Sequence, residues 1–231
     1  MKLLKQLIVT ALLLFTGHQW GEAIWVFGKA QVAQLLIAKA WQSTLEAERG
    51  QIAGSRLEAR VKPWAWSDSW PVARLQWQPG QNGTEKIDHS VQADLYVLAG
   101  AHGSSLAFGP GHLDGTAAPG AGLSVIAGHR DTHFRFLEQV ALKDVIRLQD
   151  SQGSWKNYQV LHTEVRNKDE HPLVIDDSYN GVLLITCYPF DAINAGGPLR
   201  YLVWAAAVDS DDSDTKGAFN KLEKEVKTFS I

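Results

Sequence analysis

Between residue 64 and about residue 208 the chain repeats one pattern: short β-rich runs separated by clusters of Gly, Pro, Asn and Asp. Short runs with this punctuation are typical of β-strands joined by turns. Helix-length segments between the runs are scarce, which favours a mainly β, closed or nearly closed barrel over a parallel α/β sheet. The stretch 109–122 is too rich in Gly and Pro for regular structure and is predicted to be a loop. Strands are predicted at 73–77, 93–98, 124–129, 145–148, 158–165, 182–187 and 199–208.

Residues 1–28 have the layout of an export signal. Lys2 and Lys5 precede an apolar run over residues 7–15, and apolar residues resume at 23–27 after an interruption. A charged region followed by a short apolar region is typical of a secretory signal, whereas a full membrane span needs about 20 apolar residues. Two outcomes are open, an uncleaved signal anchor or cleavage near residues 21–23. The anchor is favoured because no A-x-A cleavage site follows the apolar run.

The segments on either side of the barrel differ in character. Residues 29–60 are interpreted as a helical linker, because 29–49 contain no Gly or Pro and apolar residues recur there at helical spacing. The barrel itself is assigned to residues 61–208. Residues 209–231 are interpreted as an acidic linker and a C-terminal tail, with a possible short helix at 218–229. The predicted apolar face of the first helix consists of Val32, Leu35, Leu36, Lys39 and Ala40.

Composition excludes several classes of protein. Hydrophobic residues make up 45% of the 231 residues, which is ample for a core and argues against wholesale disorder. A formal net charge of -3 provides no broad cationic surface, so nucleic acid is not an expected partner. The single cysteine permits no disulfide within the chain, and no clustered Cys/His pattern for zinc is present.

That single cysteine, Cys187, closes the predicted strand at 182–187. A catalytic cysteine acts as a thiolate, which a neighbouring His, Lys or Arg favours. Among eight histidines, His129 is the best candidate, because it ends a β-rich run directly after Gly128, where side chains leave the core. Arg200 opens the next strand after a loop. If the two strands are antiparallel neighbours, Arg200 returns beside Cys187 and can offer N–H donors to an oxyanion.

Three separated motifs resemble the sortase family of cysteine transpeptidases: "GHLDGTAAPGAGLSVIAGHRDTHF", "TCYPF" and "PLR". The resemblance runs from about residue 64 to 208 and is greatest to class D and to the group from Gram-negative proteobacteria. It implies that His129, Cys187 and Arg200 occupy the three catalytic positions, with Thr186 before the nucleophile as a candidate substrate-binding residue. The usual T-L-x-T-C pattern reads L-L-I-T-C here, with Leu183 in place of the first Thr.

The resemblance also implies a fold, a reaction and partners. The fold is a closed sortase-type barrel of about eight strands with short helices, preceded by the N-terminal helix. The reaction is cleavage of an LPxTG-like C-terminal sorting signal through a thioacyl-enzyme intermediate, with transfer to an amine. Partners are an exported protein carrying that signal, an amine acceptor and, through the N-terminal anchor, the inner membrane. The catalytic domain is then expected in the periplasm, and no cofactor is implied.

A zinc-dependent hydrolase is the rival chemical interpretation, because His129, Asp131 and His133 form an H-x-D-x-H string. Histidines four residues apart share the face of a helix, but the approach to His129 is predicted to be a strand. Asp131 and His133 are therefore interpreted as loop structure or as lining of a substrate groove.

Other interpretations concern the cysteine. Taken alone, Cys187 would more often be a small core residue than a nucleophile. A papain-like enzyme is excluded by chain order, because there the cysteine precedes the histidine and lies on a helix. An exported, non-catalytic barrel that binds peptides stays open.

Overall fold

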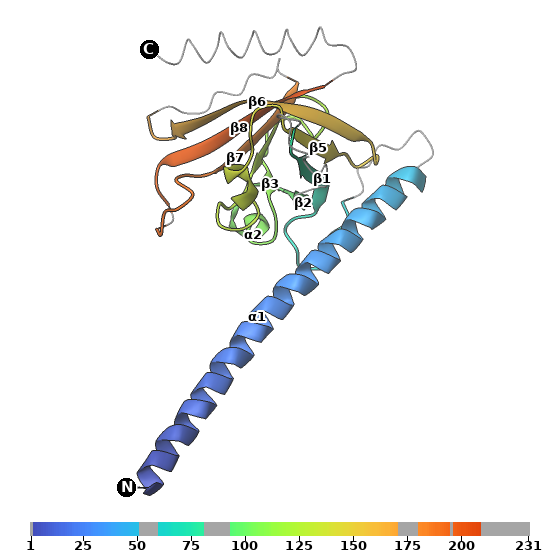
Figure 1. Ribbon diagram of the computed structural model, residues 1–231. Helices are drawn as coiled ribbons and strands as arrows, with labels where there is room; N and C mark the ends of the chain where they lie inside the picture. The colour runs from blue at the N-terminus through green and yellow to red at the C-terminus, as the bar shows by residue number, and fades with distance from the viewer. Residues whose placement is uncertain (1, 51–59, 81–92, 171–179, 195, 209–231) are drawn as a thin grey trace.

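The computed structural model describes residues 2–50, 60–80, 93–170, 180–194 and 196–208. Its body is a closed barrel with strand order β1-β2-β3-β4-β7-β8-β6-β5 (Figure 1). The predicted mainly β barrel of about eight strands is confirmed, and all seven predicted strands are present with ends shifted by at most three residues. The strands are β1 (Pro71–Gln78), β2 (Ala93–Ala99), β3 (Gly111–His112), β4 (Ser124–Ala127), β5 (Val145–Gln149), β6 (Trp155–Asn167), β7 (Gly181–Cys187) and β8 (Leu199–Ala207).

The eighth strand, β3, lies inside the segment predicted to be a loop. It has two residues, of which Gly111 pairs with Leu98 on one side and with Ala127 on the other. A Cβ atom at Gly111 would clash with the carbonyl oxygen of Gly100. The strand therefore forms through close backbone approach, which a pattern of apolar residues does not reveal.

On β7 and β8, side chains alternate between the barrel interior and an outer apolar cluster. On β7, Val182 and Leu184 belong to the interior core, whereas Leu183 belongs to the outer cluster and Ile185 packs against it. The outer cluster consists of Leu123, Val125, Leu183, Leu202, Trp204 and Ala206.

Strand β7 lies between β4 and β8 in the barrel. It runs parallel to β4, with Ala127 paired to Ile185, and antiparallel to β8. Short helices α2 (Gly103–Leu106) and η1 (Arg135–Glu138) lie in connections. Because β7 pairs with β4 on one side and β8 on the other, the ends of all three strands meet at its carboxyl end.

The N-terminal helix α1 (Lys2–Gly50) is one continuous element that leaves the barrel and extends away from it (Figure 1). The predicted helix over 29–49 is its C-terminal part, but the predicted apolar face is only partly correct, because Ala40 is buried and Leu36 is half-buried. Val32 and Leu35 are 54% and 71% exposed. Trp41 is fully buried instead, and its Nε1 donates to Gln149 Oε1 over 3.2 Å. The buried residues of this helix are Ala33, Ile37, Ala40, Trp41, Thr44 and Leu45.

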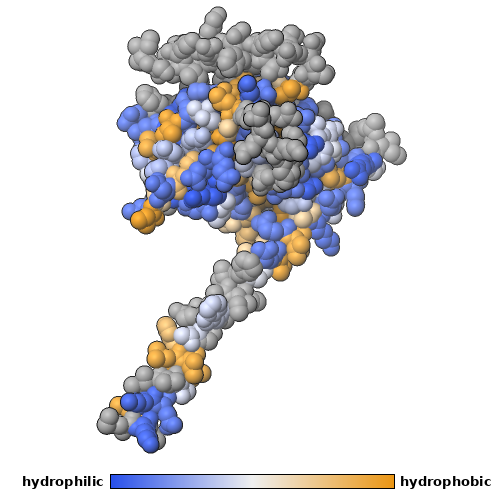
Figure 2. Space-filling model, in the orientation of Figure 1, coloured by the Kyte–Doolittle hydropathy of each residue, from blue (hydrophilic) through white to orange (hydrophobic). Residues whose placement is uncertain are grey.

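The small side chains of Ala33 and Ala40 explain this face, because they allow Ile37 and Trp41 to approach the barrel closely. Figure 2 shows the resulting contrast, with apolar residues exposed along the outer part of α1 and a largely polar barrel surface on this side.

Two predictions concern the chain ends. An export signal or anchor is predicted over residues 1–28. Within the ranges that the structure describes, no helix combines the length and the hydropathy that crossing a membrane requires. The predicted acidic linker and tail, 209–231, lie outside the described residues, as does part of the predicted linker, 51–59.

Candidate active site

Cys187 is the last residue of β7, and Arg200 is the residue directly opposite it on β8. The sequence analysis required these strands to be antiparallel neighbours, and this is confirmed. The thiol is free and half-buried. Directly opposed residues of an antiparallel pair project to the same face of the sheet, so both side chains lie on the face that carries the outer apolar cluster.

His129 reaches the same place from the other side of β7. Strand β4 ends at Ala127, two residues earlier than predicted, and the Gly128 N–H still donates to Ile185 O over 3.0 Å. His129 lies two residues beyond Ala127, and Cys187 lies two residues beyond its partner Ile185. The parallel register therefore brings the histidine alongside the cysteine, and His129 is exposed.

Two buried contacts fix the backbone beneath this pair. Thr186 is 2% exposed, and its Oγ1 donates to Gly128 O over 2.8 Å, which ties β7 to the end of β4. A Cβ atom at Gly128 would lie 2.6 Å from Cγ of Phe134, a fully buried ring. Glycine is thus required for the close packing that the sequence analysis expected here. Contact between Thr186 and a substrate stays a prediction. In this structure its hydroxyl donates to the Gly128 carbonyl.

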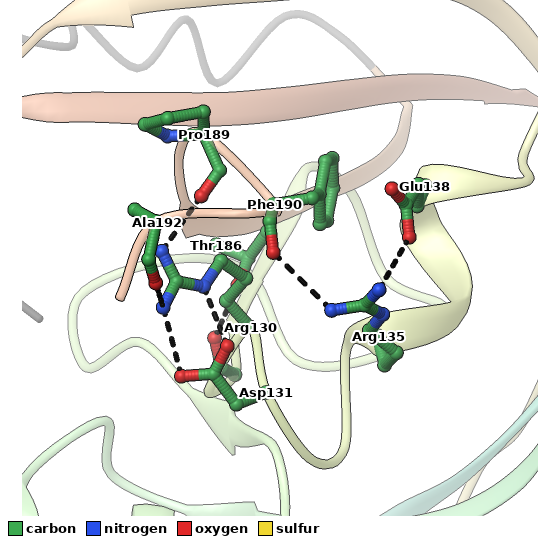
Figure 3. Close-up of polar contacts among 9 residues, drawn as sticks. Arg130, Asp131, Arg135, Glu138, Thr186, Pro189, Phe190 and Ala192 are labelled. Atoms are coloured by element: carbon green, nitrogen blue, oxygen red, sulfur yellow. Dashed lines mark hydrogen bonds and ion pairs between the residues drawn. The ribbon is translucent and has the colours of Figure 1, made fainter. Parts of the chain in front are cut away.

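Arg130, which the sequence analysis did not consider, directly follows His129 and contacts the loop after Cys187 (Figure 3). It is 5% exposed. Its Nε and Nη2 donate to the two carboxylate oxygens of Asp131 over 2.7 and 2.9 Å. Its Nη1 donates to Pro189 O over 2.6 Å, and Nη2 also donates to Ala192 O over 2.8 Å. In the sequence, the one indication that Arg130 belongs to the site is that an Arg-Asp pair directly follows the candidate histidine.

The electrostatics of Arg130 link it to the thiol. Its pKa is raised, first by the hydrogen bonds to Asp131, against the opposing effect of burial, and further by the negative charges of Asp131, Cys187 and Asp191. The pKa of Asp131 is lowered by the same hydrogen bonds and by the charges of Arg130, Arg135 and His129. Asp131 is therefore an ionised carboxylate that forms an ion pair with Arg130.

His133 is half-buried, and its pKa is lowered by burial first and by the neighbouring His129 second. It lines a cavity of about 500 Å³ together with Trp77, Arg135 and Phe136. In the part of the chain that the structure describes, no three His, Cys, Asp or Glu residues are grouped as metal ligands would be. The H-x-D-x-H string lies in the turn after β4, where Asp131 pairs with Arg130.

Arg200 is half-buried, and its Nη1 donates to two backbone carbonyls, Gly197 O over 2.7 Å and Leu199 O over 2.8 Å. Both acceptors belong to the stretch immediately before it. A further histidine of the sequence motif, His112, uses Nε2 to contact Ala117 O over 2.9 Å and Thr116 Oγ1 over 3.1 Å. His112, the second residue of β3, therefore ties this strand to the loop that follows it.

Comparison with known proteins identifies the family. The sortase domain matches residues 86–208, more than half of the chain, so the chain belongs to the sortase family. It is 30% identical over 120 residues to Sortase D of Bacillus subtilis (strain 168), a match that covers 51% of this chain and 60% of that relative. The structure resembles Sortase A from Corynebacterium diphtheriae with a TM-score of 0.50 and 25% identity, covering 83% of this chain and 99% of that one.

Proposed function

We propose that this protein is a cysteine transpeptidase that cleaves an LPxTG-like C-terminal sorting signal and transfers the acyl group to an amine. One observation supports this above all. The register of β4, β7 and β8 brings His129, Cys187 and Arg200 to one edge and one face of the barrel. Membership of a family of cysteine transpeptidases supports the same chemistry.

The first half-reaction forms a thioester. The Cys187 thiolate attacks the carbonyl carbon of the signal's Thr, and the carbonyl oxygen becomes an oxyanion. As the amide C–N bond breaks, His129, acting as an imidazolium, gives a proton to the departing amine. Arg200 donates N–H groups to the oxyanion or to the bound signal.

The second half-reaction reverses these roles. An acceptor amine attacks the thioester carbonyl, His129 takes the proton from that amine, and the C–S bond breaks to regenerate the thiolate. The product is a new amide. Water in place of the amine gives hydrolysis, so the same site also acts as an endopeptidase.

The class and location are part of the proposal. The similarity to Sortase D supports a class D-like enzyme, and the motif context supports the group from Gram-negative proteobacteria. Lys2, Lys5 and the apolar residues after them support export. We propose that the catalytic domain acts in the periplasm, at the inner membrane. Cell fractionation, with protease added from the periplasmic side, tests this: a catalytic domain that stays protected in intact spheroplasts contradicts it.

The proposed reaction is tested with a quenched LPxTG-like peptide, with and without an added amine, on the full chain. We expect cleavage by the native protein, an amide product when the amine is present, and loss of both in Cys187→Ala at unchanged melting temperature. Peptide binding without cleavage by the native protein would instead support the non-catalytic barrel. Cleavage that disappears on chelation and returns with zinc would support the metal hydrolase.

A further inference from the structure

We propose that Arg130 is a positioning residue for this reaction. It fastens the first turn after Cys187 to the turn that carries His129, and it holds a permanent positive charge beside the thiol. The inference rests on the proposed thiol chemistry and goes beyond it, because it assigns a role to a residue outside the three candidate catalytic positions.

The geometry supports the fastening role. Arg130 directly follows His129, while the two carbonyls it bonds (Figure 3) lie two and five residues after Cys187, at Pro189 and Ala192. One side chain therefore bridges the two segments that carry the candidate base and nucleophile. A guanidinium presents its donors in a rigid planar fork, and three of the nitrogens of Arg130 are occupied by four acceptors.

The burial of Arg130 reduces the screening of its positive charge. Arg130 is 5% exposed, whereas the Asp131 side chain that holds it is 61% exposed. A charge removed from water is screened far less than one that water surrounds. The positive charge of Arg130 is therefore held in a less screened place than the carboxylate that pairs with it.

The charged groups around Cys187 come from three segments. His129, Arg130 and Asp131 lie on the turn after β4, Asp191 lies in the loop after β7, and Arg200 lies opposite on β8. Arg200 bonds backbone carbonyls of its own stretch. Arg130 is the buried arginine of this set, and it is protonated at every working pH.

The single thiol of the chain allows a direct test without substrate. We would measure the rate of alkylation by iodoacetamide against pH for the native protein, Arg130→Gln and Arg130→Lys. Arg135→Gln is the matched control, because Arg135 also donates to this loop, at Phe190 O over 3.2 Å, yet it is a more exposed arginine paired with Glu138. Melting curves and peptide cleavage are recorded for each variant.

We expect the pH of half-maximal alkylation to rise by about one unit in Arg130→Gln, because a positive charge next to the thiolate is lost. In Arg130→Lys this pH stays close to the native value, since the charge is kept, but cleavage falls by about tenfold because an ammonium cannot replace the fork. Arg135→Gln leaves both the pH profile and cleavage near native values.

An unchanged alkylation profile in folded Arg130→Gln overturns the role of the charge. Native cleavage in Arg130→Lys overturns the fastening role, and this variant also decides the matter if Arg130→Gln fails to fold. Failure of the proposed function is distinguishable, because it removes peptide cleavage from the native protein and leaves the alkylation profiles measurable.

Discussion

The two ends of the connection between β7 and β8 are held in different ways. The end next to Cys187 is bonded from outside, by Arg130 at Pro189 and Ala192 and by Arg135 at Phe190. Phe190 is also 9% exposed and packs in the barrel core. Beyond Ala192 the contacts differ: Ile193 is 99% exposed, and Arg200 bonds backbone carbonyls of its own stretch, at Gly197 and Leu199.

This difference suggests which candidate site residues are held in place and which can move when a substrate binds. The candidate nucleophile and base are set by contacts from separate elements, so their relative position does not depend on a substrate. Arg200, in contrast, is held only by two hydrogen bonds from Nη1 to nearby carbonyls among the contacts described above, so we expect its guanidinium to adjust when a substrate binds. We infer that the site is organised in advance around Cys187 and completed by Arg200 when the signal binds.

Replacing Arg200 tests the adjustable end and should have the largest effect. We expect Arg200→Lys to lower turnover by about 10²–10³, since removing an oxyanion donor typically costs that much and Lys lacks the planar fork. Arg200→Met should lose as much, with a melting temperature close to native. Peptide cleavage beside a melting curve measures both. Native turnover in Arg200→Lys would show that Arg200 supplies only positive charge.

Gly128→Ala tests the fixed end. The new methyl group meets the ring of Phe134, so we expect a loss of about 1–3 kcal/mol in the free energy of unfolding, as in other overpacked cores. Urea denaturation measures this. Gly103→Ala is the control, because a Cβ atom there meets no heavy atom within 4 Å. Equal stability of the two variants contradicts the close packing inferred at Gly128.

Thr186→Val removes one buried hydrogen bond and nearly preserves the shape of the side chain. We expect the unfolding free energy to fall by about 1 kcal/mol, because the Gly128 carbonyl loses its Thr186 donor. Turnover should fall as well, since Gly128 leads directly into His129. A variant with native stability but no turnover would instead indicate that Thr186 contacts the substrate, as the sequence analysis proposed.

Ile193→Ser should have the smallest effect. This side chain is almost fully exposed, and surface substitutions usually change stability by less than about 0.5 kcal/mol. The midpoint of urea denaturation measures the change. A loss above 1 kcal/mol in the free energy of unfolding would mean that the connection after Ala192 is held as firmly as the part before it. The contrast between the two parts would then be wrong.

The sequence predicts those parts of the site that are close along the chain. Cys187 and Arg200 belong to consecutive strands, so a short connection between them implies antiparallel pairing. His129 could be selected by its position after Gly128 at the end of a β-rich run, but its pairing beside Cys187 could not be inferred, because the two parallel strands are far apart in sequence. Thr186 and Gly128, which tie these strands, are 58 residues apart.

The contacts that the sequence does not reveal involve backbone groups that are far apart along the chain. The bonds from Arg130 go to carbonyl oxygens, and every residue type supplies such an acceptor. The two-residue strand β3 likewise forms without any apolar alternation. On α1, residues at helical spacing predict a helix, but which of two adjacent apolar faces packs inward is decided by the shape of the barrel surface.

The parallel pairing of β4 and β7 has a consequence for folding. The hairpin of β5 and β6 and the pair of β1 and β2 join neighbours in sequence, so they can form while the chain is still growing. Strand β7 pairs with its neighbour β8, but its pairing with β4 requires a long loop to close first. Until β4 and β7 pair, the candidate base and the thiol lie on separate parts of an open chain. The proposed chemistry therefore becomes possible only when this long-range pairing forms, and a nascent chain carries a cysteine without its histidine.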